Sequence, residues 1–313
     1  MGNSYKALML GLLASLFFAV TFIVNRVMSL DDGSWIWSAS LRFFWMLPFF
    51  LVIVLSRKNF SVLWNEIKRN PLQWIVWSTV GFGIFYAPLT FAAAYSPSWL
   101  VAGTWQVTII AGIALSPLIN KQPQAKQNNL LSSLFFSGII LCGIVIMQVS
   151  QASKFTFDHL LLGTLPVLTA SFAYPLGNRK MMQLTGGRLD VYQRILGMLL
   201  GSLPFWLLLS GYDLFVNRTL PGSNQYTQTF IVAISSGVVA TALFFLATDK
   251  VRNDEKSLAR VEATQSAEVL FALLGEILIL NAPLPDRYAF IGMVLIVLGM
   301  ILHSIGFSSS NQE

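Results

Sequence analysis

The sequence predicts an all-α integral membrane protein with ten transmembrane helices, arranged as two inverted repeats of five helices each. Hydrophobic residues make up 55% of the 313 residues and charged residues only 11%, whereas soluble domains carry about 25% charged residues. Polar breaks divide the chain into ten apolar stretches of about 20 residues, the length that crosses a bilayer. The two halves also repeat several residues at a near-constant offset.

Turn residues and prolines set the limits of the predicted spans. Residues 72–120 contain no Asp, Glu, Lys, Arg or His, and this stretch is too long for one crossing. The sequence Tyr95-Ser96-Pro97-Ser98 divides it into two spans, and Pro283 ends a later one. The predicted spans are residues 5–28, 35–55, 72–94, 99–120, 130–149, 160–182, 190–209, 229–248, 257–280 and 288–305.

The distribution of Lys and Arg predicts the orientation of these spans. The N-terminal end and alternate loops carry thirteen of these residues, namely Lys6, Arg57, Lys58, Lys68, Arg69, Lys121, Lys126, Arg179, Lys180, Arg188, Lys250, Arg252 and Lys256. The opposite side carries four, namely Arg26, Lys154, Arg218 and Arg287. Because cytoplasmic loops are enriched in Lys and Arg, we expect both termini in the cytoplasm and the chain in the inner (plasma) membrane.

Several function classes find no support in the sequence. The net charge of +6 is explained by the cytoplasmic loops, so we expect no nucleic-acid partner. The only cysteine, Cys142, lies in an apolar run, and His159 and His303 are far apart with no cluster of metal ligands. There is no Gly-rich phosphate loop and no nucleophile elbow. We therefore expect no metal site, no catalytic residues, no cofactor and no enzyme activity.

The stretch from Ser257 to Leu280 carries charged residues within a membrane span. At about 100° per residue, four polar side chains fall in one arc of roughly 120°: Glu262, Gln265, Glu268 and Glu276. Arg260 points the other way. Because a charge at the bilayer centre costs about 2.5–3.5 kcal/mol on insertion scales, such a stripe is expected to face a polar pathway. The alternative is that the glutamates only join this helix to its neighbours.

Glu268 lies about eleven residues into this span, near the bilayer midplane. Burial disfavours the charged form of a carboxyl, so Glu268 could exchange a proton for a cation. The alternative is a permanently protonated Glu268 that only forms hydrogen bonds. Glu262 is the second proton-coupling candidate, and Glu276 is expected to have a structural or gating role.

The two halves of the chain align helix by helix. Asn25-Arg26 match Asn178-Arg179 at an offset of 153, Arg42 matches Arg194 at 152, Gly81 matches Gly237 at 156, and Gln106 matches Gln265 at 159. Five helices per half is an odd number, so the second half would be inverted relative to the first. Secondary transporters have this architecture, with the substrate site near the midplane between the repeats. The predicted repeats are residues 1–153 and 154–313, within one transmembrane domain.

Five residues are candidates for substrate binding: Arg42, Tyr86, Trp105, Gln106 and Gln265. Tyr86 and Trp105 are candidate walls for a cationic or aromatic substrate, because cation–π contacts contribute up to about 2 kcal/mol when desolvated. Ordinary helix packing is the alternative for both. Arg42 could hold an anionic group of the substrate or neutralise a glutamate, and the sequence leaves both open.

The segment EVLFALLGEILILNAPLPDRYAFIGMVLIVLGMI, residues 268–301, resembles the closing signature of the drug/metabolite transporter superfamily. Three further segments, GSWIWSASLRF, WSTVGFGIFYAPLTFAAAYSPSWLVAGTWQ and VEATQSAEVLFALLGEILIL, are similar to the multidrug resistance efflux transporter branch. In small multidrug resistance proteins the coupling glutamate lies in the first helix, whereas here no acidic residue precedes Asp31.

The resemblance and the midplane acids together predict a secondary active transporter. We expect proton-coupled efflux of small organic or cationic compounds, driven by the proton gradient. One alternative is a carrier for a specific metabolite, such as an amino acid or quaternary ammonium compound, in either direction. An alternative of another class is a membrane sensor or assembly factor that transports nothing. The expected partners are a small-molecule substrate and the lipid bilayer, and a homodimer is left open.

Overall fold

The computed structural model describes residues 3–119, 128–152, 156–251, 257, 260–261 and 263–309. No strand occurs in these ranges, and helices account for nearly all of the described chain. The all-α class predicted from the composition is therefore confirmed.

The first half of the chain begins with two long helices and continues through shorter helical pieces. In order they are α1 (Asn3–Leu30), α2 (Trp35–Ser56), α3 (Phe60–Arg69), α4 (Pro71–Ser78), the π-helix η1 (Thr79–Ile84), α5 (Phe85–Ala92), α6 (Ser98–Trp105), α7 (Val107–Ile119) and α8 (Asn128–Ala152).

The second half has the same kinds of element. In order they are α9 (Phe157–Thr185), α10 (Val191–Phe215), α11 (Ser223–Val232), the π-helix η2 (Ala233–Ala240), α12 (Thr241–Lys250), the short 3₁₀ helix η3 (Thr264–Ser266), α14 (Ala267–Leu280) and α15 (Arg287–Ser309). The predicted boundary between residues 153 and 154 lies outside the described residues.

Six helical segments of the described chain are long and apolar enough to cross a membrane: Ser4–Leu30, Trp35–Ser56, Pro71–Ala92, Phe157–Thr185, Val191–Phe215 and Ser223–Thr248. Two shorter apolar helices are Phe135–Gln151 and Arg287–Leu302. All eight fall on predicted spans. Residues 98–119 are divided by a break at Gln106, and the helical stretch before α14 is interrupted by η3. The two remaining predicted spans are therefore irregular helices.

Local sequence signals explain where several helices begin and end. The Ser34 hydroxyl accepts a hydrogen bond from the backbone N–H of Ile36 and caps α2. Asp190 and Gln193 form a capping box that starts α10. Gly186 has a φ of +53° and ends α9, because this left-handed conformation suits glycine. These residues therefore fix the start of α2, the end of α9 and the start of α10.

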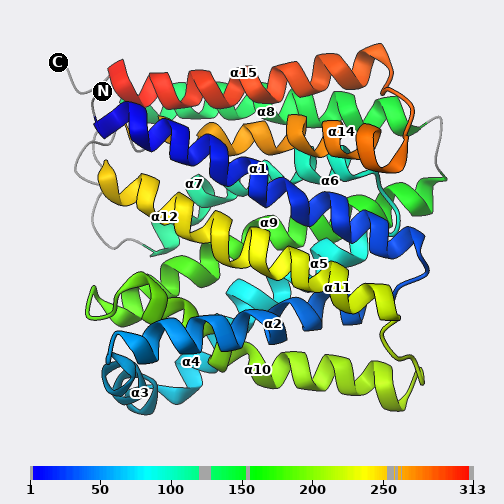
Figure 1. Cartoon of the computed structure of the whole chain (residues 1–313). Helices are drawn as coiled ribbons and strands as arrows, with labels where there is room; N and C mark the ends of the chain where they lie inside the picture. Colours follow the sequence, from blue (N-terminus) through cyan, green and yellow to red (C-terminus); the bar gives the residue numbers. More distant parts are fainter. Residues whose placement is uncertain are drawn as a thin grey trace.

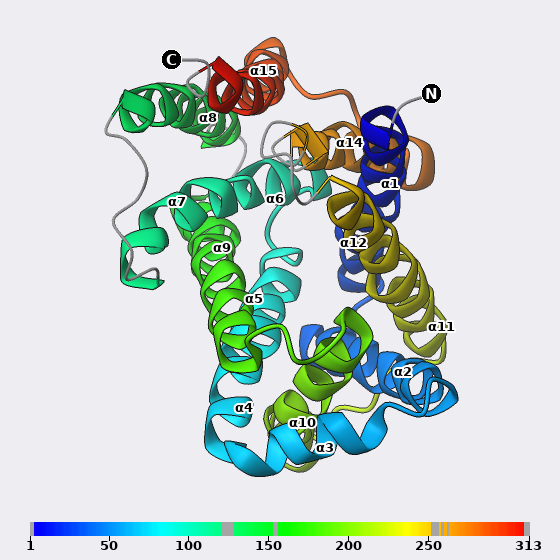
Figure 2. The same cartoon turned by 90° about the vertical axis from the view of Figure 1, so that its left-hand side faces the viewer.

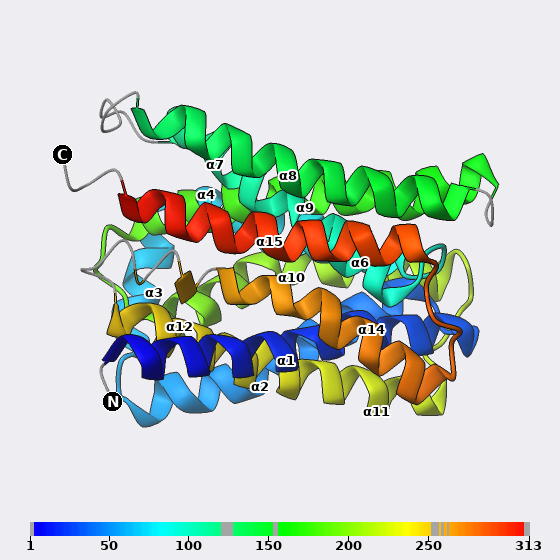
Figure 3. The same cartoon turned by 90° about the horizontal axis from the view of Figure 1, so that it is seen from above.

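The long helices run side by side in one bundle, and α1 begins at the end of the bundle where α15 ends (Figure 1). Viewed along the helices, α8 and α15 form a pair at the perimeter, and the other elements surround a common centre (Figure 2). The view from above shows the same shared axis direction (Figure 3). Because elements from both halves surround the centre, a central site would draw side chains from both.

The packing of the two halves follows one pattern. Helix α1 packs against η2, α12 and α14, and α9 packs against η1, α5, α6 and α7. Helix α2 packs against α10, and α6 packs against α14. Each half therefore places its first helix against the third and fourth helical segments of the other half.

Glycines allow the closest helix contacts. A Cβ added to Gly177 of α9 would lie 2.3 Å from the backbone N of Gly81, so the two backbones touch. A Cβ added to Gly143 of α8 would lie 2.6 Å from the carbonyl oxygen of Gly292 in α15. These two contacts set the spacing of η1 with α9 and of α8 with α15.

Helix α3 lies across the end of the bundle, roughly perpendicular to the long helices (Figure 2). The Arg188 guanidinium donates two hydrogen bonds, of 2.8 and 2.9 Å, to the Glu66 carboxylate of α3. Gln193 also donates to the carbonyl oxygen of Asn59, at 2.8 Å. These contacts join α3 to the connection between α9 and α10.

Candidate functional site

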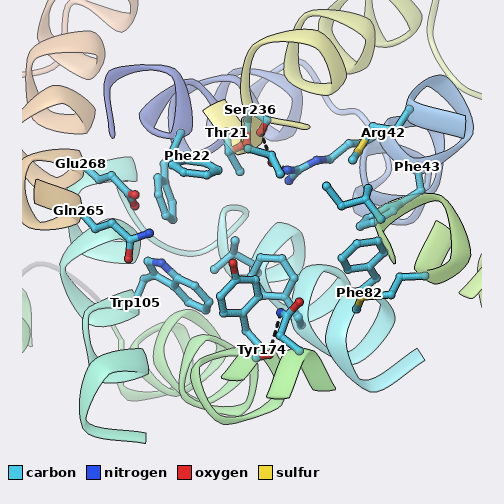
Figure 4. A pocket seen from close by; sticks show the side chains of 18 of the residues that line it. Thr21, Phe22, Arg42, Phe43, Phe82, Trp105, Tyr174, Ser236, Gln265 and Glu268 are labelled. Atoms are coloured by element: carbon cyan, nitrogen blue, oxygen red, sulfur yellow. Dashed lines mark hydrogen bonds between the residues drawn. The ribbon is translucent and has the colours of Figure 1, made fainter. Parts of the chain in front are cut away.

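A cavity lies at the centre of the bundle, where the polar and aromatic side chains of both halves meet (Figure 4). The centre of a water molecule can occupy a volume of about 100 Å³ inside it. Its walls are Phe18, Thr21, Phe22, Arg42, Phe43, Met46, Phe82, Phe85, Leu89, Trp105, Tyr174, Asn178, Arg194, Ile195, Met198, Ser236, Thr241, Gln265 and Glu268. Four predicted site residues are in this set, namely Arg42, Trp105, Gln265 and Glu268.

Arg42 of α2 provides the basic side of the cavity. Its side chain is only 7% exposed, and its Nη2 donates a 3.0 Å hydrogen bond to the Ser236 hydroxyl of η2. Its Nε has no hydrogen-bond partner among the described residues. A buried guanidinium has five N–H donors, so one neutral hydroxyl satisfies only part of its hydrogen-bonding capacity.

Tyr86 lies behind Arg42 and does not line the cavity. The Tyr86 ring is fully buried, and the guanidinium carbon of Arg42 is 4.0 Å from its centre. The Tyr86 hydroxyl lies 3.1 Å from Nδ2 of Asn25 in α1, so this hydrogen bond joins α1 to α5. The cation on the Tyr86 ring is therefore Arg42 of the protein itself, whereas the sequence predicted a cationic substrate there.

Glu268 provides the acidic side of the cavity from the first turn of α14. It is 2% exposed, and no ion pair within 4 Å involves it in the part of the chain that the structure describes. Figure 4 shows Glu268 beside Gln265, across the open space from Arg42. Glu262 lies outside the described residues. The cavity therefore has an acidic side and a basic side that do not contact each other.

The break between α6 and α7 decides the place of Gln106. The backbone N–H of Gln106 donates to the carbonyl oxygen of Gly103 at 3.1 Å, and its side chain donates to that of Ala102 at 3.2 Å. Gln106 is 1% exposed and is not among the cavity-lining residues. Its pseudo-symmetry mate Gln265 does line the cavity. The structure therefore brings only one of the two predicted glutamines to the site.

Aromatic rings form the wall between the two charged sides. The ring centres of Phe85 and Trp105 are 5.1 Å apart, and Tyr174 lies 4.8 Å from Phe85 and 5.5 Å from Trp105. Figure 4 places Trp105 below Gln265, with Tyr174 farther along the same wall. This cluster presents an apolar, polarisable surface to the open space.

Glu276 belongs to a second polar cluster that does not line the cavity. Its Oε2 accepts a 3.4 Å hydrogen bond from the backbone N–H of Trp99, in the first turn of α6. The first turn of a helix has N–H groups without a partner inside the helix, and Glu276 accepts one of them. Arg26 of α1 donates to the carbonyl oxygens of Ala93 and Ala94, which follow α5, at 2.9 and 3.1 Å. These bonds hold the end of α5 and the start of α6.

Several cavity residues were not predicted as site residues. Arg194 was detectable, because it is an ionisable residue inside a span and the offset mate of Arg42. Thr21 and Ser236 give no comparable signal, since hydroxyl residues are common in membrane helices. Thr21 is 4% exposed, and its hydroxyl has no hydrogen-bond partner among the described residues. No group of three metal-ligating side chains occurs in the described chain.

Comparison with known proteins identifies the family. A family model described as "EmrE: Putative multidrug resistance efflux transporter" matches residues 5–309. The chain belongs to this family. The EmrE-like transporter family is not a family of enzymes, and its members are multi-pass membrane proteins that act on small molecules, in agreement with the apolar helices found here.

Two relatives of this EmrE-like chain are similar over most of its length. "Uncharacterized protein YjlA" of Bacillus subtilis (strain 168) is 54% identical over 306 residues, which are 96% of this chain and 94% of the relative. "Uncharacterized 42.1 kDa protein in intracellular alkaline protease 3'region" of Shouchella clausii is 48% identical over 271 residues, 85% of this chain and 71% of the relative.

A solved structure has the same fold as this EmrE-like chain. It is titled "Crystal structure of protein", and it aligns with a TM-score of 0.66 and 15% identity over 99% of both chains. At this identity the likeness is one of fold alone.

Proposed function

We propose that this EmrE-like protein is a secondary active transporter that couples the export of small organic molecules to a proton gradient. The observation that carries this proposal is the Glu268 carboxyl on the wall of a central cavity, remote from any ion-pair partner in the described chain. An ionisable group in such a place is typical of proton and substrate pathways.

The coupling follows from the energetics of the carboxyl group. An unpaired carboxylate in an apolar interior is expensive, so the empty cavity is expected to hold Glu268 in its protonated form. A substrate ammonium next to Glu268 would favour the carboxylate instead. Proton and substrate would then compete for one site, and this competition is the basis of antiport. Glu262 remains the second candidate for this role.

We further propose that the ten helical segments form two inverted repeats, residues 1–153 and 154–313. The rare π-helices η1 and η2 support this, because each lies in the third segment of its half and contains one of the matched glycines, Gly81 or Gly237. Gln106 and Gln265, also matched, both lie at helix irregularities. The mirrored packing of α1 and α9 supports the same arrangement.

In the proposed orientation the chain spans the inner (plasma) membrane, and both termini lie on the cytoplasmic side. The start of α1 and the end of α15 lie at one end of the bundle, and so does α3 with its basic residues Lys68 and Arg69 (Figure 1). This supports the assignment of that end to the Lys- and Arg-rich side. Glu276 and Arg26 would then close the outer end of the central path.

Transport into sealed vesicles tests the proposal. Purified protein is reconstituted with a pH gradient across the vesicle membrane, and the flux of a bound compound is followed. We expect accumulation on the acidic side, because export exchanges substrate for incoming protons, and loss of accumulation when an ionophore removes the gradient. A sensor or assembly factor would bind ligand and show no flux. Flux that ignores the pH gradient would identify a uniporter or another coupling ion.

A further inference from the structure

The central cavity has charged groups of opposite sign on opposite sides. Glu268 enters from α14 and Arg42 from α2, and Figure 4 shows the open space between them. No ion pair within 4 Å joins the two in the described chain. The rings of Phe22, Trp105 and Tyr174 lie along the space between these groups (Figure 4).

Arg42 is a buried cation, and no ion pair within 4 Å joins it to an acidic group in the described part of the chain. It is 7% exposed, its Nη2 bonds a neutral hydroxyl, and its Nε has no partner among the described residues. The Tyr86 ring offsets only part of the desolvation of the charge. A guanidinium with free donors is the geometry that binds a carboxylate through two parallel hydrogen bonds.

The charged groups of the cavity do not match a ligand that carries a single charge. The Arg42 guanidinium and the Glu268 carboxyl both line the cavity. A monovalent cation would gain from Glu268 but would share a small cavity with the positive charge of Arg42. A monovalent anion would gain from Arg42 but would lie opposite a carboxyl. Each leaves one side of the cavity unmatched.

We propose that the substrate class of this cavity is a dipolar organic ion, with an ammonium group at one end, a carboxylate at the other and an apolar or aromatic body between them. This inference rests on the proposed function, since it takes the cavity as the transport site. The carboxylate binds the Arg42 guanidinium, with the Thr21 hydroxyl on the same side. The ammonium binds Glu268 and the side-chain oxygen of Gln265. The body packs on Trp105 and Tyr174.

The dipolar class is consistent with proton antiport, whereas a plain anion is not. The ammonium meets Glu268 in its charged form, so a proton leaves as the substrate arrives. An anion alone would favour a protonated Glu268, and proton and substrate would then travel together. Arg42 thereby adds recognition without altering the direction of coupling.

Three probes that share one ring test the proposal by calorimetry on the purified full chain. These are 4-(aminomethyl)benzoate, which carries both charges, benzylamine, which carries the cation alone, and benzoate, which carries the anion alone. Because hydrogen bonds to charged groups are among the stronger ones, we expect the dipolar probe to bind about tenfold or more tightly than either of the others. Equal or tighter binding of benzylamine, or no binding of the dipolar probe, would overturn the class.

Substitutions test which cavity residue binds each charged end of the dipolar probe. Arg42→Gln should abolish the advantage of the dipolar probe over benzylamine and leave benzylamine affinity unchanged or improved. Glu268→Gln should abolish its advantage over benzoate. An unchanged affinity ratio in Arg42→Gln contradicts the assignment. If Arg42→Gln does not fold, Thr21→Val tests the same side, and it should weaken the dipolar probe and spare benzylamine.

Vesicle transport separates this inference from the proposed function. Dipolar binding that depends on Arg42 and Glu268, without flux driven by a pH gradient, supports the substrate class and refutes proton-coupled export. A second outcome is flux of benzylamine driven by a pH gradient, together with a dipolar-probe affinity that is unchanged in Arg42→Gln. This outcome supports proton-coupled export and refutes the dipolar class.

Discussion

The guanidinium carbon of Arg42 lies 4.0 Å from the centre of the fully buried Tyr86 ring. The Tyr86 hydroxyl lies 3.1 Å from the Asn25 side chain, so the ring is fixed from its far end. The cation of α2 therefore rests on an aromatic face of α5 that is itself held by α1. This arrangement stabilises a charge at the cavity wall without neutralising it, and it leaves the Nε of Arg42 without a hydrogen-bond partner among the described residues.

Replacing Tyr86 separates the role of its ring from that of its hydroxyl. Tyr86→Leu removes the ring under Arg42, and since a desolvated cation–π contact contributes about 0.5–2 kcal/mol, binding of 4-(aminomethyl)benzoate should weaken about 2- to 30-fold. Tyr86→Phe keeps the ring and should retain this affinity, with a lower midpoint of thermal unfolding from the lost hydrogen bond to Asn25. Equal affinity losses in the two variants would show that the ring does not position Arg42.

Glu268→Gln should uncouple transport from the proton gradient. The amide keeps the size and hydrogen bonding of the carboxyl but cannot exchange a proton. We expect inserted, folded protein without gradient-driven accumulation, while exchange of substrate across vesicles without a gradient survives. The matched control is Glu276→Gln, which alters the other buried glutamate of α14 but lies outside the cavity and should retain coupling. Accumulation at the unmodified rate in Glu268→Gln would transfer the role to Glu262 or to another ion.

Gly177→Ala should destabilise the fold at the contact of α9 with η1. The added methyl would lie 2.3 Å from the backbone N of Gly81 and 3.0 Å from the carbonyl oxygen of Trp77, so the helices must move apart. Overpacking of this kind typically costs about 1–3 kcal/mol. Gly211→Ala in α10 is the control, because a methyl there meets no atom within 4 Å. Equal unfolding midpoints for the two variants would contradict the contact.

The ion pair between Glu66 and Arg188 should make stability pH-dependent at acidic pH. The Arg188 guanidinium, which donates two hydrogen bonds to the carboxylate, lowers the pKa of Glu66. Because the folded-state pKa lies below the unfolded one, the contribution is present above the ordinary Glu pKa and is lost as pH falls through the folded value. The contribution should be small, since the Arg188 side chain is 44% exposed and solvent screens the pair.

The unfolding midpoint of the full chain and of Glu66→Gln, measured from neutral to acidic pH, checks this ion pair. The difference between the two proteins should be largest at neutral pH and should shrink as the carboxyl of the unsubstituted chain becomes protonated. A difference that stays constant with pH would mean that Glu66 contributes through packing and not through its charge.

Cysteine labelling tests the orientation. On a Cys142→Ser background, Asn224→Cys near the start of α11 should react with a membrane-impermeant reagent from outside intact cells, since residue 224 is exposed. Gln124→Cys, in the predicted cytoplasmic loop, should react only after permeabilisation. The reverse pattern would contradict the orientation predicted from the distribution of Lys and Arg.

The charged site residues were predictable because a membrane span tolerates few ionisable groups. Arg42 and Glu268 are conspicuous in the sequence for this reason, and both line the cavity. The positions of Tyr86 and Gln106 were less predictable. A rotation of 100° per residue assumes an unbroken helix, whereas α6 ends at Trp105 and Gln106 turns back toward Ala102. For Tyr86, the sequence shows a ring but not which cation covers its face.

The irregular backbone near the site was also hidden from the sequence pattern. The segments η1 and η2 are mostly apolar and contain glycines, which are frequent in regular transmembrane helices, so their composition predicts only a span. The carbonyl that accepts each N–H in these segments depends on contacts with helices that lie elsewhere in the chain, such as the contact of α9 with η1. Hydrophobicity therefore located the spans, while the position of each break depended on tertiary packing.

The π-helix η1 determines where in this span the deletion of a single residue can be tolerated. A π-turn closes its hydrogen bond over five residues and not four, so Thr79–Ile84 holds more residues per turn than an α-helix does. A single-residue deletion there can convert the irregular turn to an α-turn and keep α4 and α5 in phase. The same deletion inside α4 would rotate every following residue of that span by about 100° and turn its lipid face inward. Length variants that remain functional should therefore accumulate at η1 and η2 before they appear elsewhere in a span.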